Sequence, residues 1–512
     1  MNRLAAWLDN PILIKHARSR LRRMQIFPAV AVVGVLSLCI VLLGYNYNGL
    51  TGGQAFGGLM ALQATLLGVV GAAQVGNSVG KARESGILDF HRASPMAPAA
   101  LTLGFFFGAP VREYLLFAAT LPFSLACVVM GRPSISGFFQ LMVPLVLSAW
   151  ILQAVALFNA LGWKSSKAGI RGVIGLAVFI FMGSGGLFAV FSGAAVTVDE
   201  SPKLLFFGLE LPWLAVVALD AIPAIGFLMV ASTRKMASER AHPLSKPQAV
   251  ACLATGATLL LGGLWGIDWF GYWGLTTLYI LMIGAFAMAV AITPTRDEFA
   301  KGVRRAAREA RRSPTAWEDR GLNRIPLFCL CAVVLAASTM AWRMIEEPLA
   351  EGSRRGPVSY SLSIAIGVLV VAYFGLALQY FQLRFARRAS VFMALFLFAA
   401  WLIPILVGTI AAASAANRSV PGGEPDTWSA ALFSLSPLAG IAIASGAGEI
   451  PGHQAARAAA LIPALTFALL FNNLVTAARR RIVREIHPEP APHADPKLGP
   501  ELAELADPGA LP

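Results

Sequence analysis

Charged residues are scarce in this chain. Only 13% of its 512 residues are Asp, Glu, Lys or Arg, about half the share of a typical soluble protein, and 57% are hydrophobic. This balance excludes an ordinary water-soluble domain and indicates a protein whose solvent is the lipid bilayer. The net charge of +14 fits that class without nucleic acid as a partner, because basic residues gather in the cytoplasmic loops of membrane proteins.

The side chains that usually carry catalysis or bind metals show no recognisable pattern. The five cysteines all lie in apolar runs, without the spacing of a zinc site or a disulfide framework. The six histidines lie in loops, polar helices and the tail, and neither His-Glu-x-x-His nor Gly-x-Ser-x-Gly occurs. We therefore predict a chain that is not an enzyme and that holds no metal or cofactor of its own.

A complete nucleotide-binding loop is also missing. Its pattern, Gly-x4-Gly-Lys-Ser/Thr, is approached at residues 76–81, which have one residue too few between the glycines. Ala82 follows where a hydroxyl group would bind magnesium, and the segment follows an apolar helix instead of a strand. Energy for any transport must then come from a partner protein or from an ion gradient.

Apolar runs long enough to cross a bilayer, which takes about 20 residues, are abundant. We predict an all-α polytopic membrane protein with about twelve transmembrane helices, at 26–43, 55–75, 111–130, 138–162, 172–193, 211–231, 248–265, 273–292, 326–342, 360–380, 390–413 and 456–477. With the N-terminus inside, 33 of the 41 Lys and Arg residues fall in cytoplasmic segments and 7 fall outside. This bias predicts that both termini are cytoplasmic.

Loop lengths predict that the spans form two six-helix halves. In each half, a larger cytoplasmic loop follows the second helix, at 76–99 and again at 293–325. The chain then divides into a cytoplasmic basic amphipathic helix, a first membrane half, a cytoplasmic linker, a second membrane half, and a cytoplasmic tail that is basic and then disordered: 1–25, 26–231, 232–247, 248–477 and 478–512.

Two basic helices are predicted at the membrane surface. The first begins at Asn10-Pro11, where Asn caps the helix, and reaches residue 24 with an apolar stripe. The stripe consists of Leu13, Ala17, Leu21 and Met24. The second begins at Thr295, which forms a capping-box pattern with Glu298, and its stripe consists of Phe299, Val303, Ala307 and Ala310. Either helix could rest on anionic lipid or receive a partner protein.

Two further apolar segments are too irregular for ordinary spans. Residues 100–110 run into Arg112-Glu113, whose charges are costly at depth, so we place this segment in the interface and begin the third span at Val111. Residues 428–446 are broken by Pro437, and a span there would move the basic run 479–481 outside. We therefore predict a re-entrant or interfacial helix pair, with a thirteenth span as the alternative.

The loop at 76–99 contains a stretch with an acidic-x-Gly-x-Leu-acidic pattern followed by Ser-Pro. In this respect the chain resembles the export-type (type 2) permeases of ABC transporters, in which such a stretch forms a short helix that contacts a separate ATPase. The residues to which this resemblance assigns ATPase coupling are Arg83, Glu84, Gly86, Leu88, Asp89, Ser94 and Pro95. The resemblance covers about residues 1–130, and the loop at 293–325 lacks the pattern.

The resemblance implies a permease subunit in the inner membrane of a cell, surrounded by membrane lipid and able to form a homodimer. ATP would be bound by a cytoplasmic ABC ATPase partner, which would itself act as a dimer. Two alternatives stay open: a gradient-driven secondary transporter and a membrane scaffold that transports nothing. Against the first, the Gly-x3-Asp-Arg motif of the major facilitator layout has Gly80 at its Asp position.

One charge is predicted deep in the membrane. Asp220 lies midway along the sixth span, three residues before Pro223. A carboxylate at that depth must face a cavity, find a hydrogen-bond donor or be protonated. Its role is either in transport or in a structural hydrogen bond near the proline kink.

Overall fold

The structure is a computed structural model, and it describes residues 10–46, 53–130, 134–162, 203–264, 273–311, 313–349, 358–416, 432–444 and 460–487. The described residues are almost entirely helical, apart from one two-stranded antiparallel hairpin. They include ten apolar helical runs that are long enough to cross a membrane. The chain is therefore an all-α polytopic membrane protein, as the sequence predicts.

The first half of the chain, which we define as residues 10–237, begins with a short helix at the polar end of the bundle. Its elements are α2 (Pro11–Arg20), α3 (Arg23–Asn46), α4 (Gly53–Ala64), the π-helical turn η1 (Thr65–Val70), α5 (Gly71–Glu84), α6 (Ile87–Ala93), α7 (Pro98–Gly108), α8 (Val111–Val129), α9 (Ile135–Gly162), β1 (Lys203–Phe206), β2 (Leu209–Pro212) and α11 (Trp213–Ala237).

The second half, which we define as residues 246–487, follows a short polar linker. Its elements are α12 (Lys246–Leu264), α13 (Trp273–Ile292), α14 (Arg296–Arg308), α15 (Arg324–Leu349), α16 (Val358–Phe385), the 3₁₀ turn η3 (Ala386–Arg388), α17 (Ala389–Leu397), the π-helical turn η4 (Phe398–Leu402), α18 (Ile403–Ala416), α20 (Pro437–Ala444) and α22 (Leu461–Ile486).

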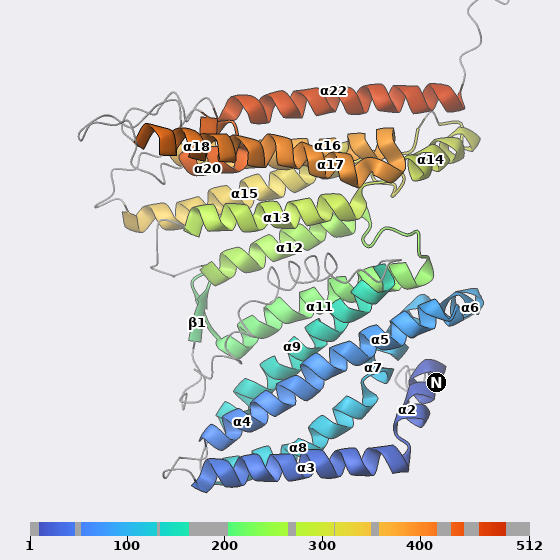
Figure 1. Cartoon of the computed structure of the whole chain (residues 1–512), viewed down its shortest axis with the longest axis vertical. Helices are drawn as coiled ribbons and strands as arrows, with labels where there is room; N and C mark the ends of the chain where they lie inside the picture. Colours follow the sequence, from blue (N-terminus) through green and yellow to red (C-terminus); the bar gives the residue numbers. More distant parts are fainter. Residues whose placement is uncertain are drawn as a thin grey trace, which may run out of the picture.

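The long helices lie side by side across the molecule, from α3 at one extreme to α22 at the other, and largely follow chain order, although α8 lies next to α3 (Figure 1). Each half has its own buried core. The cores of the first half pack α5, α7 and α9 around residues such as Val79, Phe105 and Leu157, and α4, α8 and α9 around Phe56. The core of the second half is larger and extends to Ala231 of α11, so the two halves are in direct contact.

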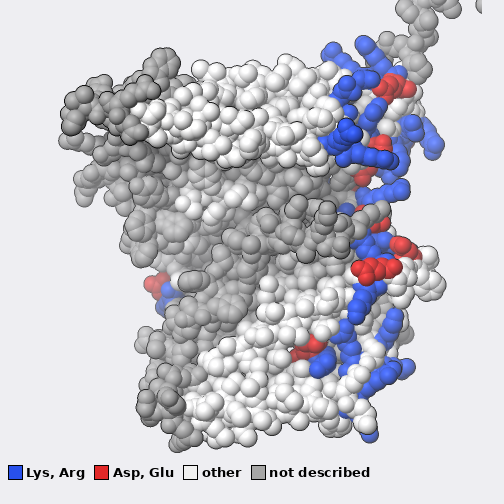
Figure 2. Space-filling view, in the orientation of Figure 1, with Lys and Arg blue, Asp and Glu red and all other residues white. Residues whose placement is uncertain are grey.

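The basic residues lie at one end of the helices. Figure 2 shows Lys and Arg along one edge of the molecule, which is the end where α6 and α14 lie in Figure 1. We call this end the basic rim. The β1–β2 hairpin lies at the opposite end, where Lys203 pairs with Glu210 at 2.9 Å. Most cations of the described residues thus lie at one end, which is what a fixed orientation in a membrane favours.

The predicted spans that fall on described residues agree with the described helices except in their ends. α8 begins at Val111, where the third span was expected, but the second span does not end at residue 75, because α5 continues to Glu84. The predicted fifth span, 172–193, lies outside the described residues. The helical run Ser361–Ala411 covers two predicted spans, which are separated by the basic turn η3. The number of twelve stays a prediction.

The two irregular apolar segments form short helices. α7 packs against α2, where Gly104 and Gly108 leave room for the backbone and side chains of residues 10–16. α20 has eight residues, too few to cross a bilayer, and is held by a hydrogen bond from the Ser363 hydroxyl to the carbonyl of Ile441. The predicted break at Pro437 is confirmed as the first residue of α20, and the described part of 428–446 forms no span.

Candidate functional site: the helical turn at the basic rim

A sharp turn separates α5 from α6. Gly86 has φ +72°, a left-handed conformation that strains any residue with a Cβ atom. Its carbonyl accepts the first hydrogen bonds of α6, from the amides of Asp89 and Phe90 at 3.1 and 3.2 Å. The glycine thus reverses the chain within two residues, and a short seven-residue helix follows at the basic rim.

The inner side of α6 is anchored to the first half. Leu88 is 1% exposed and joins the core of α5, α7 and α9. Arg92 donates hydrogen bonds to the carbonyls of Met236 and Lys235, both at 3.0 Å, at the end of α11. Arg83 forms an ion pair with Glu239 at 2.5 Å, just beyond α11. α6 and the end of α5 are therefore attached to the end of α11, the last helix of the first half.

The outer side of α6 is open to solvent. Phe90 is 73% exposed and Ile87 is 41% exposed, which is unusual for apolar residues on a polar rim. Glu84, the last residue of α5, is also exposed, and the side chain of Asp89 is 76% exposed although it pairs with Arg92 at 2.8 Å. We call Glu84, Ile87, Asp89 and Phe90 the outer surface of α6. It combines apolar area with negative charge.

The other predicted coupling residues end the helix. The Ser94 hydroxyl donates to the carbonyl of His91 at 2.6 Å, and Ser94 itself has extended backbone angles. Pro95 follows and is exposed. All seven predicted residues therefore lie on one turn–helix–turn unit, with Arg83 and Leu88 holding it in place and the acidic residues facing outward.

A second set of contacts lies at the basic rim near the linker, and one of them joins the two halves. Arg234 of α11 pairs with Asp319 of the second half, and its Nε donates to the carbonyl of His242 at 3.1 Å. Lys246, only 1% exposed, donates to the carbonyls of Ala316 and Gly321 at 2.9 and 2.7 Å. We call these contacts the junction. They fix the linker and the 293–325 loop against α11.

A cavity of about 320 Å³ lies beside the junction, between α9, α11, α12 and α13. Its walls are mostly apolar, with Phe158, Phe227 and Met288, and its polar end holds His242 and Glu298. Burial lowers the pKa of His242, and the nearby Glu298 only partly opposes this. The imidazole is then uncharged at neutral pH, so its 3.5 Å contact with Glu298 is not an ion pair.

The predicted basic helix in the 293–325 loop is confirmed as α14, including the capping box of Thr295 and Glu298. Its buried stripe differs from the predicted one in its last turn: Ala306 is buried, whereas Ala310 is exposed beyond the helix end. Phe299 and Val303 form a small core with residues of α16 and α22. α14 therefore rests on the protein, and its opposite face is basic.

The predicted first helix begins as expected, because Asn10 caps α2 by accepting the amide of Ile12 at 3.0 Å. It ends before the predicted residue 24, because Leu21 is its C-cap and α3 starts at Arg23. Met24 is 91% exposed on α3, so it does not belong to a buried stripe of α2.

The polar residues inside the bundle are more connected than the sequence suggested. Gln63 donates to the hydroxyls of Thr120 and Ser124 at 2.8 and 2.9 Å, and Gln153 donates to the carbonyl of Leu67 in η1 at 2.9 Å. Asp220 is half-buried on α11, and no hydrogen bond joins it to another residue that the structure describes. It therefore stays a candidate for transport.

No protein-family model, no curated protein and no solved structure matches the chain. The family resemblance of the 76–99 loop therefore stays a proposal.

The sequence did not reveal the partners that hold the candidate site. Arg83 and Glu239 are 156 positions apart, and Arg234 and Asp319 are 85 apart. The only available signal was the presence of both charge signs in the linker and in both rim loops, and charge alone does not say which residues pair.

Proposed function

We propose that this chain is the membrane-spanning permease subunit of an ABC exporter, with the basic rim and both termini in the cytoplasm. The observation that carries the proposal is the outer surface of α6: apolar and acidic residues exposed on a short helix whose inner side is tied to α11. Such a surface suits a protein partner with basic and apolar residues. Two six-helix halves and an inner-membrane location belong to the same proposal.

The mechanism follows from the anchoring contacts. A cytoplasmic ATPase that pushes on α6 would move α11 through Arg92 and Arg83, and α11 reaches the second half through Arg234 and Asp319. Motion of one half against the other would open the cavity beside the junction to alternate sides. Its mostly apolar walls suit an amphipathic or lipidic substrate, and the polar residues that line it include Lys235, Arg240 and Glu298. Export is the direction that the family resemblance implies.

The test is co-purification of an ATPase with the tagged full-length chain from detergent. The variant Glu84→Ala with Phe90→Ala removes one exposed acid and one exposed aromatic ring from the outer surface of α6. We expect at least about a tenfold loss of bound ATPase activity, since exposed anchors dominate such contacts. The control, Glu309→Ala with Trp317→Ala, makes the same change on the 293–325 loop and should retain the ATPase.

The results separate the alternatives. A wild-type chain that purifies as a folded protein without any ATPase would overturn the proposal. If the control variant lost the bound ATPase and the α6 variant retained it, the ATPase would bind the 293–325 loop instead of α6. Asp220 favours a gradient-driven transporter as the second candidate, because a carboxyl group inside the membrane can carry a proton. Asp220→Asn should then abolish transport while leaving expression unchanged.

A further inference from the structure

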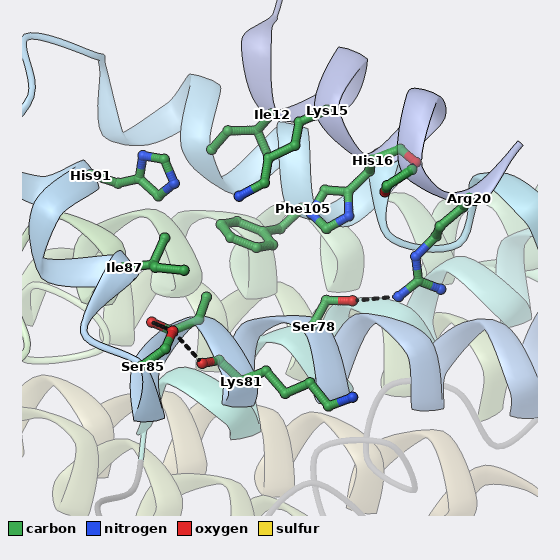
Figure 3. A pocket seen from close by; sticks show the side chains of 12 residues that line it. Ile12, Lys15, His16, Arg20, Ser78, Lys81, Ser85, Ile87, His91 and Phe105 are labelled. Atoms are coloured by element: carbon green, nitrogen blue, oxygen red, sulfur yellow. Dashed lines mark hydrogen bonds between the residues drawn. The ribbon is translucent and has the colours of Figure 1, made fainter. Parts of the chain in front are cut away.

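A second pocket opens at the basic rim, between α2, α5, α6 and α7, with a volume of about 360 Å³ (Figure 3). Its cations come from two different helices: Lys15 and Arg20 from α2, and Lys81 from α5. Three serine hydroxyls and two histidines add further polar groups, and Phe105 forms part of the apolar floor. No Asp or Glu is among the described residues that line it.

The pocket is held open by fixed contacts. Arg20 donates to the side-chain oxygen of Gln74 at 2.7 Å and to the Ser78 hydroxyl at 2.9 Å, which holds α2 against α5. The Lys15 side chain extends from α2 into the space between His91 and Phe105 (Figure 3). The site therefore does not depend on rearranging the helices that form it.

In the part of the chain that the structure describes, some cations of the basic rim are neutralised by a carboxylate, whereas the lysines of the pocket are not. Arg92, Arg234 and Arg296 each pair with a carboxylate, at Asp89, Asp319 and Glu485 respectively. Lys15 and Lys81 form no ion pair with a carboxylate among the described residues. Glu113 of α8 interacts electrostatically with Arg20, but it is buried and does not line the pocket.

The two histidines of the pocket have lowered pKa values, partly because of the nearby cations. Burial, then Arg20 and Lys15, lower the pKa of His16 to about 4. Burial and then Lys15 also lower the pKa of His91. Both rings are uncharged at neutral pH and offer N–H donors. A bound anion would accept these donors and offset the repulsion among three cations.

We propose that this pocket binds the phosphate group of an anionic phospholipid. Lys, Arg, Ser and His side chains are the donors that phosphate oxygens accept. Met24 and Phe27, at the start of α3 a few residues beyond Arg20, are 91% and 67% exposed and offer apolar surface for acyl chains. A headgroup in the pocket would hold α2 against α5 and α6. The proposal does not depend on the ATPase.

The test measures binding of phosphatidylglycerol to the purified full-length protein in a neutral detergent, by native mass spectrometry and by the rise in unfolding temperature. The pocket variant is Lys15→Gln with Lys81→Gln, two exposed positions whose change should leave the fold intact. The control is Lys301→Gln with Arg304→Gln, two exposed cations on α14. Phosphatidylcholine and inorganic phosphate serve as competing ligands.

We expect phosphatidylglycerol to bind the wild type and the control equally, and the pocket variant at least about tenfold more weakly, as the loss of two charge-assisted hydrogen bonds requires. Phosphatidylcholine and millimolar phosphate should displace little of it. Binding of inorganic phosphate without the lipid would overturn the lipid as the source of the phosphate. If both variants bound phosphatidylglycerol equally weakly, the lipid would be attracted by the overall positive charge of the basic rim and not by this pocket, which would overturn the proposal. If the pocket variant lost a bound acidic protein while its lipid binding stayed unchanged, the pocket would be a binding site for that protein and the lipid proposal would be wrong.

Discussion

At the scale of single residues, Gly86 tests whether the turn before α6 requires glycine. A Cβ atom at this position would meet nothing within 4 Å, so its cost is purely conformational. We expect Gly86→Ala to lower the free energy of unfolding by about 1 kcal/mol, the strain of a left-handed alanine. Gly80, inside α5 and equally unobstructed, is the matched control, and Gly80→Ala should stabilise the helix by about 0.5 to 1 kcal/mol. Thermal unfolding in detergent measures both, and equal effects at the two positions would contradict the assigned turn.

His16 gives a prediction about pH. Its pKa is lowered to about 4 in the folded protein, from an ordinary value of 6.5. As the pH falls below 6.5 the unfolded chain binds the proton first, so the folded state loses stability between pH 6.5 and 4. After allowance for partial exposure, we expect a loss of about 1 kcal/mol at pH 5 relative to pH 7. The unfolding temperature of His16→Gln should depend less steeply on pH in this range, and an unchanged slope would count against the assignment.

At the scale of elements, α14 shows how a basic helix is attached. Phe299 is 1% exposed and packs with Val303, Leu383 and Ile482. Phe299→Ala should cost about 3 to 5 kcal/mol locally, because it leaves a cavity that the neighbouring side chains cannot fill. Hydrogen exchange over 296–308 should then become fast. Phe90→Ala removes the same ring from an exposed site and should change stability by no more than about 0.5 kcal/mol. Slow exchange in the Phe299 variant would mean that other contacts hold α14.

The elements that the sequence predicted well are those with local signals. The Asn10 cap, the Thr295–Glu298 capping box and the start of α8 at Val111 each depend on residues within one turn. Helix ends without a local stop signal were placed wrongly: α5 passes residue 75 because Gly76–Glu84 keeps a buried face of Val79 and Ala82. The polarity of that stretch suggested a loop, whereas packing against the first half decides in favour of helix.

At the scale of the whole molecule, long-range pairing was beyond the sequence. Apolar run length and charge asymmetry predict a bundle with one basic end, since each property is a sum over many residues. The attachment of α6 to α11 depends instead on single contacts such as Arg83 with Glu239 and Arg92 with the Lys235 carbonyl. One chain holds many possible partners for each charge, and only the fold selects among them.

The last prediction concerns the contact that joins the halves. Arg234 and Asp319 are each partly buried, so their ion pair is less screened than a surface pair. A double-mutant cycle with Arg234→Gln and Asp319→Asn should give a coupling energy of about 1 to 2 kcal/mol in the free energy of unfolding. The matched control is Lys203 with Glu210 in the hairpin, which is mostly exposed and should give less than about 1 kcal/mol.

If an ATPase drives the permease by moving α6, the ion pair of Arg234 with Asp319 should transmit the motion of α11 to the second half. Either single variant should then reduce substrate-stimulated ATPase activity of the assembled complex while the amount of bound ATPase stays the same. Unchanged stimulation, together with a measurable coupling energy, would mean that the pair stabilises the junction but transmits no motion. In that case other contacts between the halves, such as those of Ala231 and Phe227 with the second core, would be the routes to test.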